Sequence, residues 1–358
     1  MRSKILQLFV LAMVLLSLCG CSQGQSLGER AIVKAVYVNP LSTGDVEAAL
    51  IVFTCEPSSD TASATGKAQI YHAQGNNLEE ALYKAECQQN KSAFYAQNQL
   101  LLLGPGAMQQ NISPYLQYFG QEDVGRLNLA VYLIQQSGEE LSECTDVIEQ
   151  VVQEGERLAE RTLAQANPSR SIYESVPGKE GENGWLPILE FSQEKDDFIG
   201  VREAALFKEG VCYDHWNETE LQMALFLDGK SKNLALQTQQ NGNLLSMKTG
   251  ALTLKKDVTQ EGKKMILHLS IEGKVEHLSF DGHASTNGAT GQEVEQVNTC
   301  VEDLANAIVK DSFYKQNDVF QWEWWLRLFN AEQVYQWELE DALDAHVQIR
   351  IKSKLQSA

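Results

Sequence analysis

The chain has 358 residues, of which 43% are hydrophobic, and a formal net charge of −19 at pH 7. Its length exceeds what one hydrophobic core usually serves, so we expect two or three domains with sizeable cores. Nucleic acid and a bare anionic membrane surface both repel an acidic chain, which argues against either as a direct partner. Association with a membrane would then require a lipid chain or a protein partner.

The N-terminus has the features of a secretory signal. Arg2 and Lys4 precede the apolar run 5–18, which is too short to span a bilayer comfortably and suits a signal-peptide core. The run ends in Leu18-Cys19-Gly20-Cys21, which resembles the bacterial lipobox. In a lipobox the cysteine is diacylated on its sulfur and becomes the N-terminal residue after cleavage. The alternative is an ordinary signal cut near Gly20 that leaves Cys21 free.

We therefore expect residues 1–20 to be a lipoprotein signal peptide and Cys21 to carry acyl chains such as palmitate. One acyl chain gives only marginal membrane binding, whereas two or three hold a protein firmly. Residues 21–28 are small and polar, which predicts a lipid-anchored tether. The protein is expected to be extracytoplasmic and to meet the lipid bilayer through Cys21.

Five further cysteines are widely spaced and include no C-x-x-C pair: Cys55, Cys87, Cys144, Cys212 and Cys300. Such spacing is neither a small secreted disulfide framework nor a zinc pattern. We interpret them mainly as buried small apolar residues, and one disulfide remains an open alternative.

Apolar patterns predict the elements of the first half. Residues 31–38 and 46–54 are expected to form a hairpin across a Pro/Gly/Asp loop. Asn77, with Glu80 three residues on, has the pattern of a helix cap and predicts a helix over 78–87. The remaining elements are a strand at 99–103, a helix at 107–119, a strand at 127–134 and a helix at 142–164 that Pro168 ends.

A domain boundary is expected where prolines, glycines and charges gather, over residues 166–184. We place an N-terminal domain at 29–170, a linker at 171–186 and a C-terminal domain at 187–358.

The second half is predicted to be richer in strands. Residues 200–207 and 211–216 form a hairpin, after which Asn217 caps a helix. A long helix opens at Thr290, with Glu293 as its capping partner. Further strands are expected at 187–191, 234–238, 244–254, 265–272 and 346–352. Together these elements predict a mixed α+β fold in which helices cover the sheets.

The order of these elements resembles the Ger(x)C family, the lipoprotein C subunits of bacterial spore nutrient germinant receptors. In the first half, residues 75–82 (GNNLEEAL) and the strand 100–103 before Gly104 are similar to family segments. In the second half the similar segments are 204–208 (AALFK) with Gly210, the helix start 218–220, Asp318-Val319-Phe320, Trp325, Trp337 and the strand 347–351. The chain departs from the family pattern at Ser22-Gln23, Asn39, Gln321 and Glu323.

This resemblance implies a non-enzymatic subunit that acts in spore germination beside two integral membrane subunits of a germinant receptor. It implies a place on the outer face of the spore inner membrane, where nutrient sensing leads to release of ions and dipicolinate. It also implies three compact subdomains, so we expect the second half to divide again near Gly288. The alternative is a lipoprotein solute-binding module of a transporter, but that class is built of two similar lobes of alternating strands and helices.

Motifs for chemistry are missing from the sequence: it has no nucleophile elbow, phosphate loop, H-E-x-x-H or dinucleotide fingerprint. Cys212 and His215 resemble a nucleophile and base, but on a regular strand they point to opposite faces. The spacing of His268, His277 and His283 fixes no zinc site. We therefore expect no catalytic residue, no metal ligand and no cofactor.

Four of the six tryptophans lie within residues 322–337. If residues 318–329 are helical, the large side chains fall on two faces, one with Phe320, Trp324, Trp325 and Leu328 and the other with Trp322 and Phe329. One buried face cannot hold them all. We therefore expect a partner-binding surface at Trp322, Trp325 and Phe329, with core packing of the last helix as the alternative.

Overall fold

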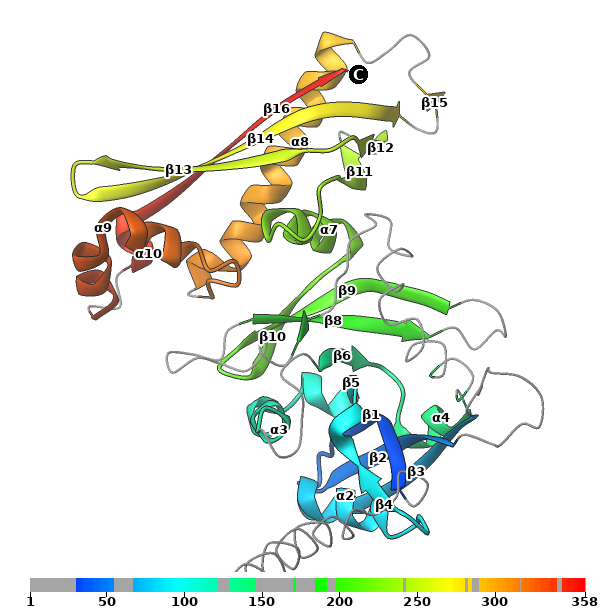
Figure 1. The fold of residues 1–358 in the computed structure, drawn as a ribbon. Coiled ribbons are helices and arrows are strands. Elements are labelled where there is room, and N and C mark those ends of the chain that lie inside the picture. The colour runs from blue at the N-terminus through cyan, green and yellow to red at the C-terminus, as the bar shows by residue number, and fades with distance from the viewer. Residues whose placement is uncertain are drawn as a thin grey trace, which may run out of the picture.

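The computed structural model describes residues 30–54, 67–121, 129–143, 145, 148, 170–171, 184–191, 198–240, 243–280, 283–284, 290–315, 317–339 and 343–357. The expected signal peptide, Cys21 and the tether lie outside these residues, as does most of the expected helix 142–164. In the described part the chain forms an elongated molecule with one sheet toward each end (Figure 1).

The first sheet has ten strands and takes in most of the N-terminal half. Its members in order across the sheet are β10 (Val211–Trp216), β9 (Phe198–Lys208), β8 (Gly184–Phe191), β6 (Ala130–Ile134), β5 (Leu100–Leu103), β1 (Arg30–Pro40), β2 (Val46–Thr54) and β3 (Lys67–Gly75), with β4 (Ser92–Phe94) beside β1 and β7 (Arg170–Ser171) beside β6. The central neighbours β1, β5, β6 and β8 pair in parallel, and the strands on both flanks are antiparallel.

Both faces of the central strands are buried, which explains their continuous apolar runs. Along β1, Ala35 and Tyr37 belong to one hydrophobic core, whereas Val36 and Val38 belong to the other. Helix α2 (Leu78–Glu86) covers β2 and β3, and it begins as expected at Asn77, whose Oδ1 accepts a hydrogen bond from the Glu80 amide at 2.8 Å. The other helical segments here are η2 (Tyr95–Gln97), η3 (Pro105–Met108), α3 (Ser113–Phe119) and α4 (Gly138–Glu143).

The first sheet continues past the expected domain boundary. Strand β8 begins at Gly184, inside the expected linker 171–186, and pairs with β6 from the expected N-terminal domain. Residues 172–183 lie outside the described part. The last strand of the first sheet ends at Trp216. The chain therefore passes to the second sheet after Trp216, and not at residues 166–184, where its proline and glycine content predicted a domain boundary.

The second sheet belongs wholly to the C-terminal part. It contains β11 (Ala235–Gln240), β12 (Asn243–Thr249), β13 (Thr253–Glu261), β14 (Lys264–Phe280), β15 (His283–Ala284) and β16 (Val347–Ser357). Strand β14 holds it together, because it pairs with each of the others except β11. Since β16 returns to pair in parallel with β14, the chain on the two sides of Gly288 builds one sheet rather than two units.

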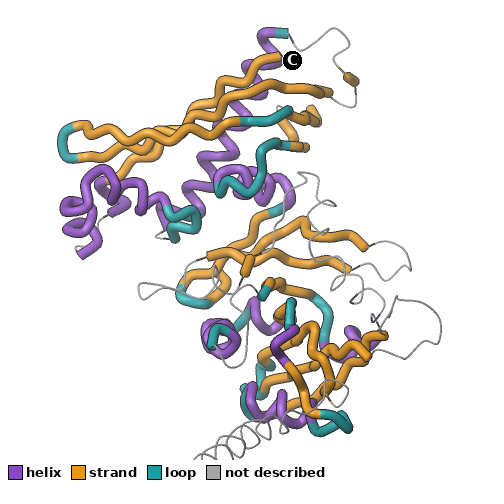
Figure 2. Tube along the Cα trace, in the orientation of Figure 1, coloured by secondary structure: helices purple, strands orange, loops and turns teal. Residues whose placement is uncertain are grey.

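Helices cover the second sheet along its core face. They are α7 (Glu218–Leu227), α8 (Gly291–Asp311), η5 (Phe313–Lys315), α9 (Trp322–Leu339) and α10 (Leu343–His346). Figure 2 shows the long helix α8 running across the strands. Its buried stripe includes Val297, Val301 and Ile308, and its N-terminus has the capping box expected at Thr290 and Glu293.

The outer edge of β16 is closed by side chains of α8. The Ser353 amide donates to Glu302 Oε1 at 2.7 Å, and the Leu355 amide donates to Asn298 Oδ1 at 2.8 Å. Exposed edge amides are a common route to unwanted strand pairing. Here α8 therefore both buries the sheet and satisfies its edge.

Several elements differ from the sequence-based expectations. Strand β3 was not expected at all, and the single strand expected at 244–254 is in fact β12, a turn and the start of β13. The helix expected at 107–119 is regular only from Ser113, because Pro114 is placed in its first turn, where it has no amide hydrogen to lose.

Candidate functional site

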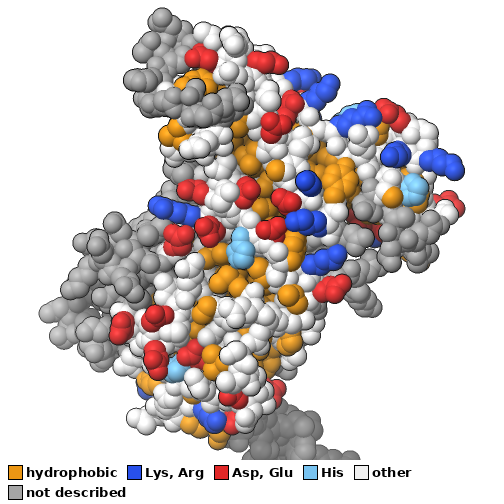
Figure 3. Space-filling model, turned by 180° about the vertical axis from the view of Figure 1, so that it is seen from behind, with side chains coloured by type: hydrophobic (Ala, Val, Ile, Leu, Met, Phe, Trp, Pro, Cys, Tyr) orange, Lys and Arg blue, Asp and Glu red, His pale blue; other side chains and the backbone are white. Residues whose placement is uncertain are grey.

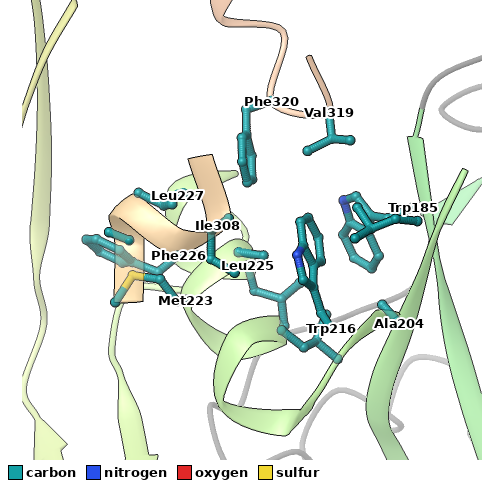
Figure 4. Packing of buried hydrophobic residues seen from close by; sticks show 14 of the residues in the cluster. Trp185, Ala204, Trp216, Met223, Leu225, Phe226, Leu227, Ile308, Val319 and Phe320 are labelled. Atoms are coloured by element: carbon teal, nitrogen blue, oxygen red, sulfur yellow. The ribbon is translucent and has the colours of Figure 1, made fainter. Parts of the chain in front are cut away.

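A chain of aromatic rings joins the two sheets through the interior. Trp185 of β8 lies 6.0 Å from Trp216 of β10, and Trp216 stacks on Phe320 at 6.1 Å between ring centroids. Phe320 then stacks on Trp322 at 4.6 Å, and Trp322 lies 6.4 Å from Phe313. Figure 4 shows Trp185, Trp216 and Phe320 lining one packed interior. We call Trp185, Trp216, Phe320 and Trp322 the aromatic stack.

Trp322, expected at a partner-binding surface, is fully buried as a member of this stack. Its ring is covered by Phe320 and Phe313 and has no face left for another protein. The expectation was wrong for this residue because helix α9 begins at Trp322 itself, so the helical periodicity assumed from residue 318 does not apply. Trp325 and Phe329 do lie at the surface.

Asn317 and Asp318 hold the start of α9 against the first sheet. The Asn317 side-chain amide donates to the Phe207 carbonyl at 3.1 Å and to the Tyr213 hydroxyl at 2.8 Å. Asp318 Oδ2 accepts a hydrogen bond from the Glu323 amide at 2.7 Å. Burial raises the pKa of Asp318 to about 6, because the charged carboxylate is separated from water. The carboxyl that caps α9 is therefore unusually easy to protonate.

Beyond its first residues, α9 presents large apolar side chains to the outside. The exposed members, with their exposed fractions, are Trp324 (62%), Trp325 (41%), Leu328 (63%), Phe329 (48%) and Tyr335 (61%). These five make up most of the large exposed hydrophobic side chains in the described part of the chain. Clusters of this kind mark binding surfaces more often than single exposed side chains do. We call these five residues the α9 patch.

A bend at Asn330 shapes the α9 patch. Asn330 leaves the helical conformation, with φ −154° and ψ 87°, and its Oδ1 accepts a hydrogen bond from the Gln333 amide at 3.2 Å. Arg327 ties the two segments together, because it pairs with Glu323 in the first and with Glu338, at 2.9 Å, in the second. Burial and the nearby Glu323 raise the pKa of Glu338 to about 7, even though Arg327 opposes the shift.

The patch is supported from below by β13. The Lys256 ammonium lies 5.4 Å from the centre of the Trp325 ring, a cation–π contact. Gln260 Nε2 lies 3.5 Å from Gln333 Oε1. One side of α9 thus contacts the sheet, with Trp325 at the border between this side and the exposed one.

Cys212 and His215 come closer than a regular strand allows. Pairing between β9 and β10 shifts register between Cys212 and Asp214, and this bulge brings Cys212 Sγ to 3.9 Å from His215 Nε2. The expectation that the two side chains point apart was therefore wrong. Burial nevertheless raises the pKa of the Cys212 thiol, which is the opposite of nucleophile activation.

No metal site is evident among the residues that the structure describes, where no group of three His, Cys, Asp or Glu side chains could hold an ion. His268 bonds Thr259 at 2.8 Å, and the side chain of His283 lies outside the described part. Cys87, Cys212 and Cys300 are free thiols in the described part, which does not include Cys55 or Cys144. No described helix is both long and apolar enough to cross a membrane.

A buried polar cluster in the first sheet was missed from the sequence. Glu47 Oε2 accepts hydrogen bonds from Asn39 Nδ2 at 3.0 Å and Tyr37 Oη at 3.3 Å, and Glu47 Oε1 lies 2.5 Å from His72 Nε2. Burial raises the pKa of Glu47, but the bonds from His72 and Asn39 outweigh it, and the net shift is downward. The sequence signal for this cluster was Glu47, the one charged residue in the apolar run 46–54.

Asn39 suits this cluster better than an aspartate would. Asn39 donates to Glu47 through Nδ2 and accepts from the Gly106 amide through Oδ1 at 2.8 Å. An aspartate could not donate and would place two carboxylates together. The cluster is internally satisfied and serves the fold.

Two comparisons with known proteins found similarity. Residues 23–190 match the spore germination protein N-terminal domain. The crystal structure of the GerBC protein is similar with a TM-score of 0.53 and 13% sequence identity, over 90% of this chain and 96% of that chain. At this identity the likeness concerns the fold, and it confirms the α+β architecture expected from the sequence. A comparison with curated proteins found no match.

The different burial of Trp322 and Trp325 gives a test on stability. We predict that Trp322→Ala lowers the free energy of unfolding by about 3–5 kcal/mol, because it removes a fully buried ring. Trp325→Ala should cost about 1 kcal/mol or less, since much of its ring is already in water. Urea unfolding of both variants measures the difference. Equal losses would contradict the placement of these two rings.

The buried carboxyl of Asp318 predicts a dependence on pH. Its folded pKa of about 6 lies above the ordinary value of 3.8, so its contribution to stability is present at low pH and is lost as pH rises from about 4 to 6. Asp318→Asn removes this titration. The stability of the variant relative to the original chain should therefore increase by about 2–3 kcal/mol between pH 4 and pH 7 in urea unfolding. A difference that is the same at both pH values would show that Asp318 titrates normally.

Proposed function

We propose that the chain is a lipid-anchored subunit of a nutrient germinant receptor, because residues 23–190 match the spore germination protein N-terminal domain and the fold is similar to that of GerBC. In this proposal it lies on the outer face of the spore inner membrane and acts beside two integral membrane subunits. The observation that carries the proposal is the match of residues 23–190 to the germination-protein domain. This range starts two residues after Cys21, so processing at Cys21 would leave the matched domain whole.

The proposed role is one of binding rather than catalysis. Cys212 beside His215 is the candidate nucleophile considered from the sequence. Its thiol has a raised pKa and donates a hydrogen bond to the Asp214 carbonyl at 3.7 Å. The described side chains support no metal site. By contrast, the α9 patch leaves large apolar side chains in contact with water. Exposed apolar clusters of this kind mark surfaces that bind another molecule. We propose that this patch, including Trp325 and Phe329, is the surface through which the folded part takes its position in the membrane-bound receptor.

Germination of spores that carry single changes tests this role. Cys21→Ala should release the protein from the membrane fraction and reduce the nutrient response to that of a deletion strain. The double variant W325Q/F329Q should remain membrane-bound at normal protein level but respond about tenfold more slowly, as expected for loss of a contact worth about 1.4 kcal/mol. Tyr83→Ser, at an aromatic residue that is 67% exposed on α2, serves as the matched control and should respond normally.

Two results would count against the proposal. A deletion strain whose spores respond normally to every nutrient tested would remove the role in germination. Unchanged membrane retention of the Cys21→Ala variant would remove the anchor.

A further inference from the structure

The side-chain types of the α9 patch indicate which kind of surface it binds. It combines two tryptophans and a tyrosine with Leu328 and Phe329, each between 41% and 63% exposed. Tryptophan and tyrosine are enriched where a bilayer meets water, because their rings are apolar and their edges carry a hydrogen-bond donor. Helices that lie in this interface have such residues, with leucine and phenylalanine, on one face.

The charge around the patch differs from that of the whole chain. Residues 253–264, which are β13 and its turn into β14, together with helix α9 contain five basic and five acidic residues, so these segments have no formal net charge although the chain carries −19. Exposed Lys263 in the turn and exposed Lys264 at the start of β14 lie close in the chain to Gln260, which contacts α9. Figure 3 shows basic and apolar side chains together on the arm that carries this hairpin and α9. Here the repulsion from an anionic lipid surface is weaker than the charge of the whole chain implies.

The acidic side chains of α9 do not oppose such a contact strongly. Arg327 pairs with both Glu323 and Glu338, and it does so across the bend at Asn330. Paired charges cost less to bring near a membrane than isolated ones, because part of their field is already compensated. Two of the three glutamates of α9 are therefore paired, and Glu332 is the exposed acidic side chain that remains beside the patch.

We infer that the α9 patch docks in the headgroup region of a lipid bilayer and forms a second membrane contact besides Cys21. The inference rests on the proposed function, because the lipid on Cys21 brings a bilayer within reach. Strand β1, which follows the tether, and helix α9 lie in different parts of the elongated molecule (Figure 1). Making both contacts at once requires the long axis of the protein to lie along the membrane surface.

Lipid quenching of tryptophan fluorescence tests the contact directly. The full mature lipoprotein, acylated at Cys21, is reconstituted into vesicles of phosphatidylcholine and phosphatidylglycerol in which brominated phosphatidylcholine replaces the ordinary lipid. Bromine quenches only rings that reach the lipid. Of the six tryptophans, only Trp324 and Trp325 are exposed in the described part, so a fraction of the emission should be quenched.

Two variants and one control assign the quenching. W324F/W325F keeps the patch apolar but removes its reporters, so the quenched fraction should disappear. Leu328→Glu places a charge at the most exposed position of the patch and should abolish quenching while the lipid anchor still holds the protein on the vesicles. Trp337→Phe, at a ring that is only 6% exposed, should leave the quenched fraction in place.

The outcomes separate this inference from the proposed function. Protein that floats with the vesicles and shows quenching that W324F/W325F removes supports bilayer docking. Protein that floats without such quenching overturns the docking inference and leaves the patch to a protein partner, with the anchor intact. Protein that does not float overturns both the anchor and the docking.

Discussion

The stacking of Trp216 on Phe320 is the contact that joins the two halves of this protein. Trp216 ends the last strand of the first sheet, and Phe320 precedes helix α9 of the C-terminal part, yet their ring planes are only 12° from parallel. Each buried aromatic ring removes a large apolar area from water, and a stacked pair adds about 0.5–1.5 kcal/mol beyond that. The Asn317 amide, which bonds Phe207 and Tyr213, fixes the same junction with polar contacts. The two sheets are therefore joined by a shared hydrophobic core and not only by the connecting chain.

This junction also decides which side of α9 is left outside. Trp322 completes the aromatic stack and Asp318 caps the helix from within, so the beginning of α9 is inserted into the protein. Further along the helix Leu326, Val334 and Trp337 stay in the core, and the Arg327–Glu338 pair spans the bend at Asn330. The exposed α9 patch is the side of the helix that this buried side leaves outside. The surface that we propose as a membrane contact is thus positioned by the core.

The sequence predicted best those elements whose local signals agree with their tertiary surroundings. Asn217 and Thr290 each combine a capping side chain with a glutamate three residues on, and both open helices. Strand β3 was missed because its residues mix polar and apolar types without clear alternation, and it is fixed by pairing with β2. Periodicity also failed for Trp322, because a helix that starts four residues later than assumed presents different faces. The bulge that brings Cys212 and His215 together depends on β9 and has no signal within β10 itself.

The aromatic stack couples the first sheet to α9. A double-mutant cycle in Trp216→Leu and Phe320→Leu, measured by urea unfolding, tests it most directly because the cycle isolates the interaction between the two rings. The account predicts that the two changes are coupled by about 0.5–1.5 kcal/mol, with the double variant less destabilised than the sum of the single variants. Losses that add to within about 0.3 kcal/mol would contradict it, since that is the behaviour of residues that do not interact.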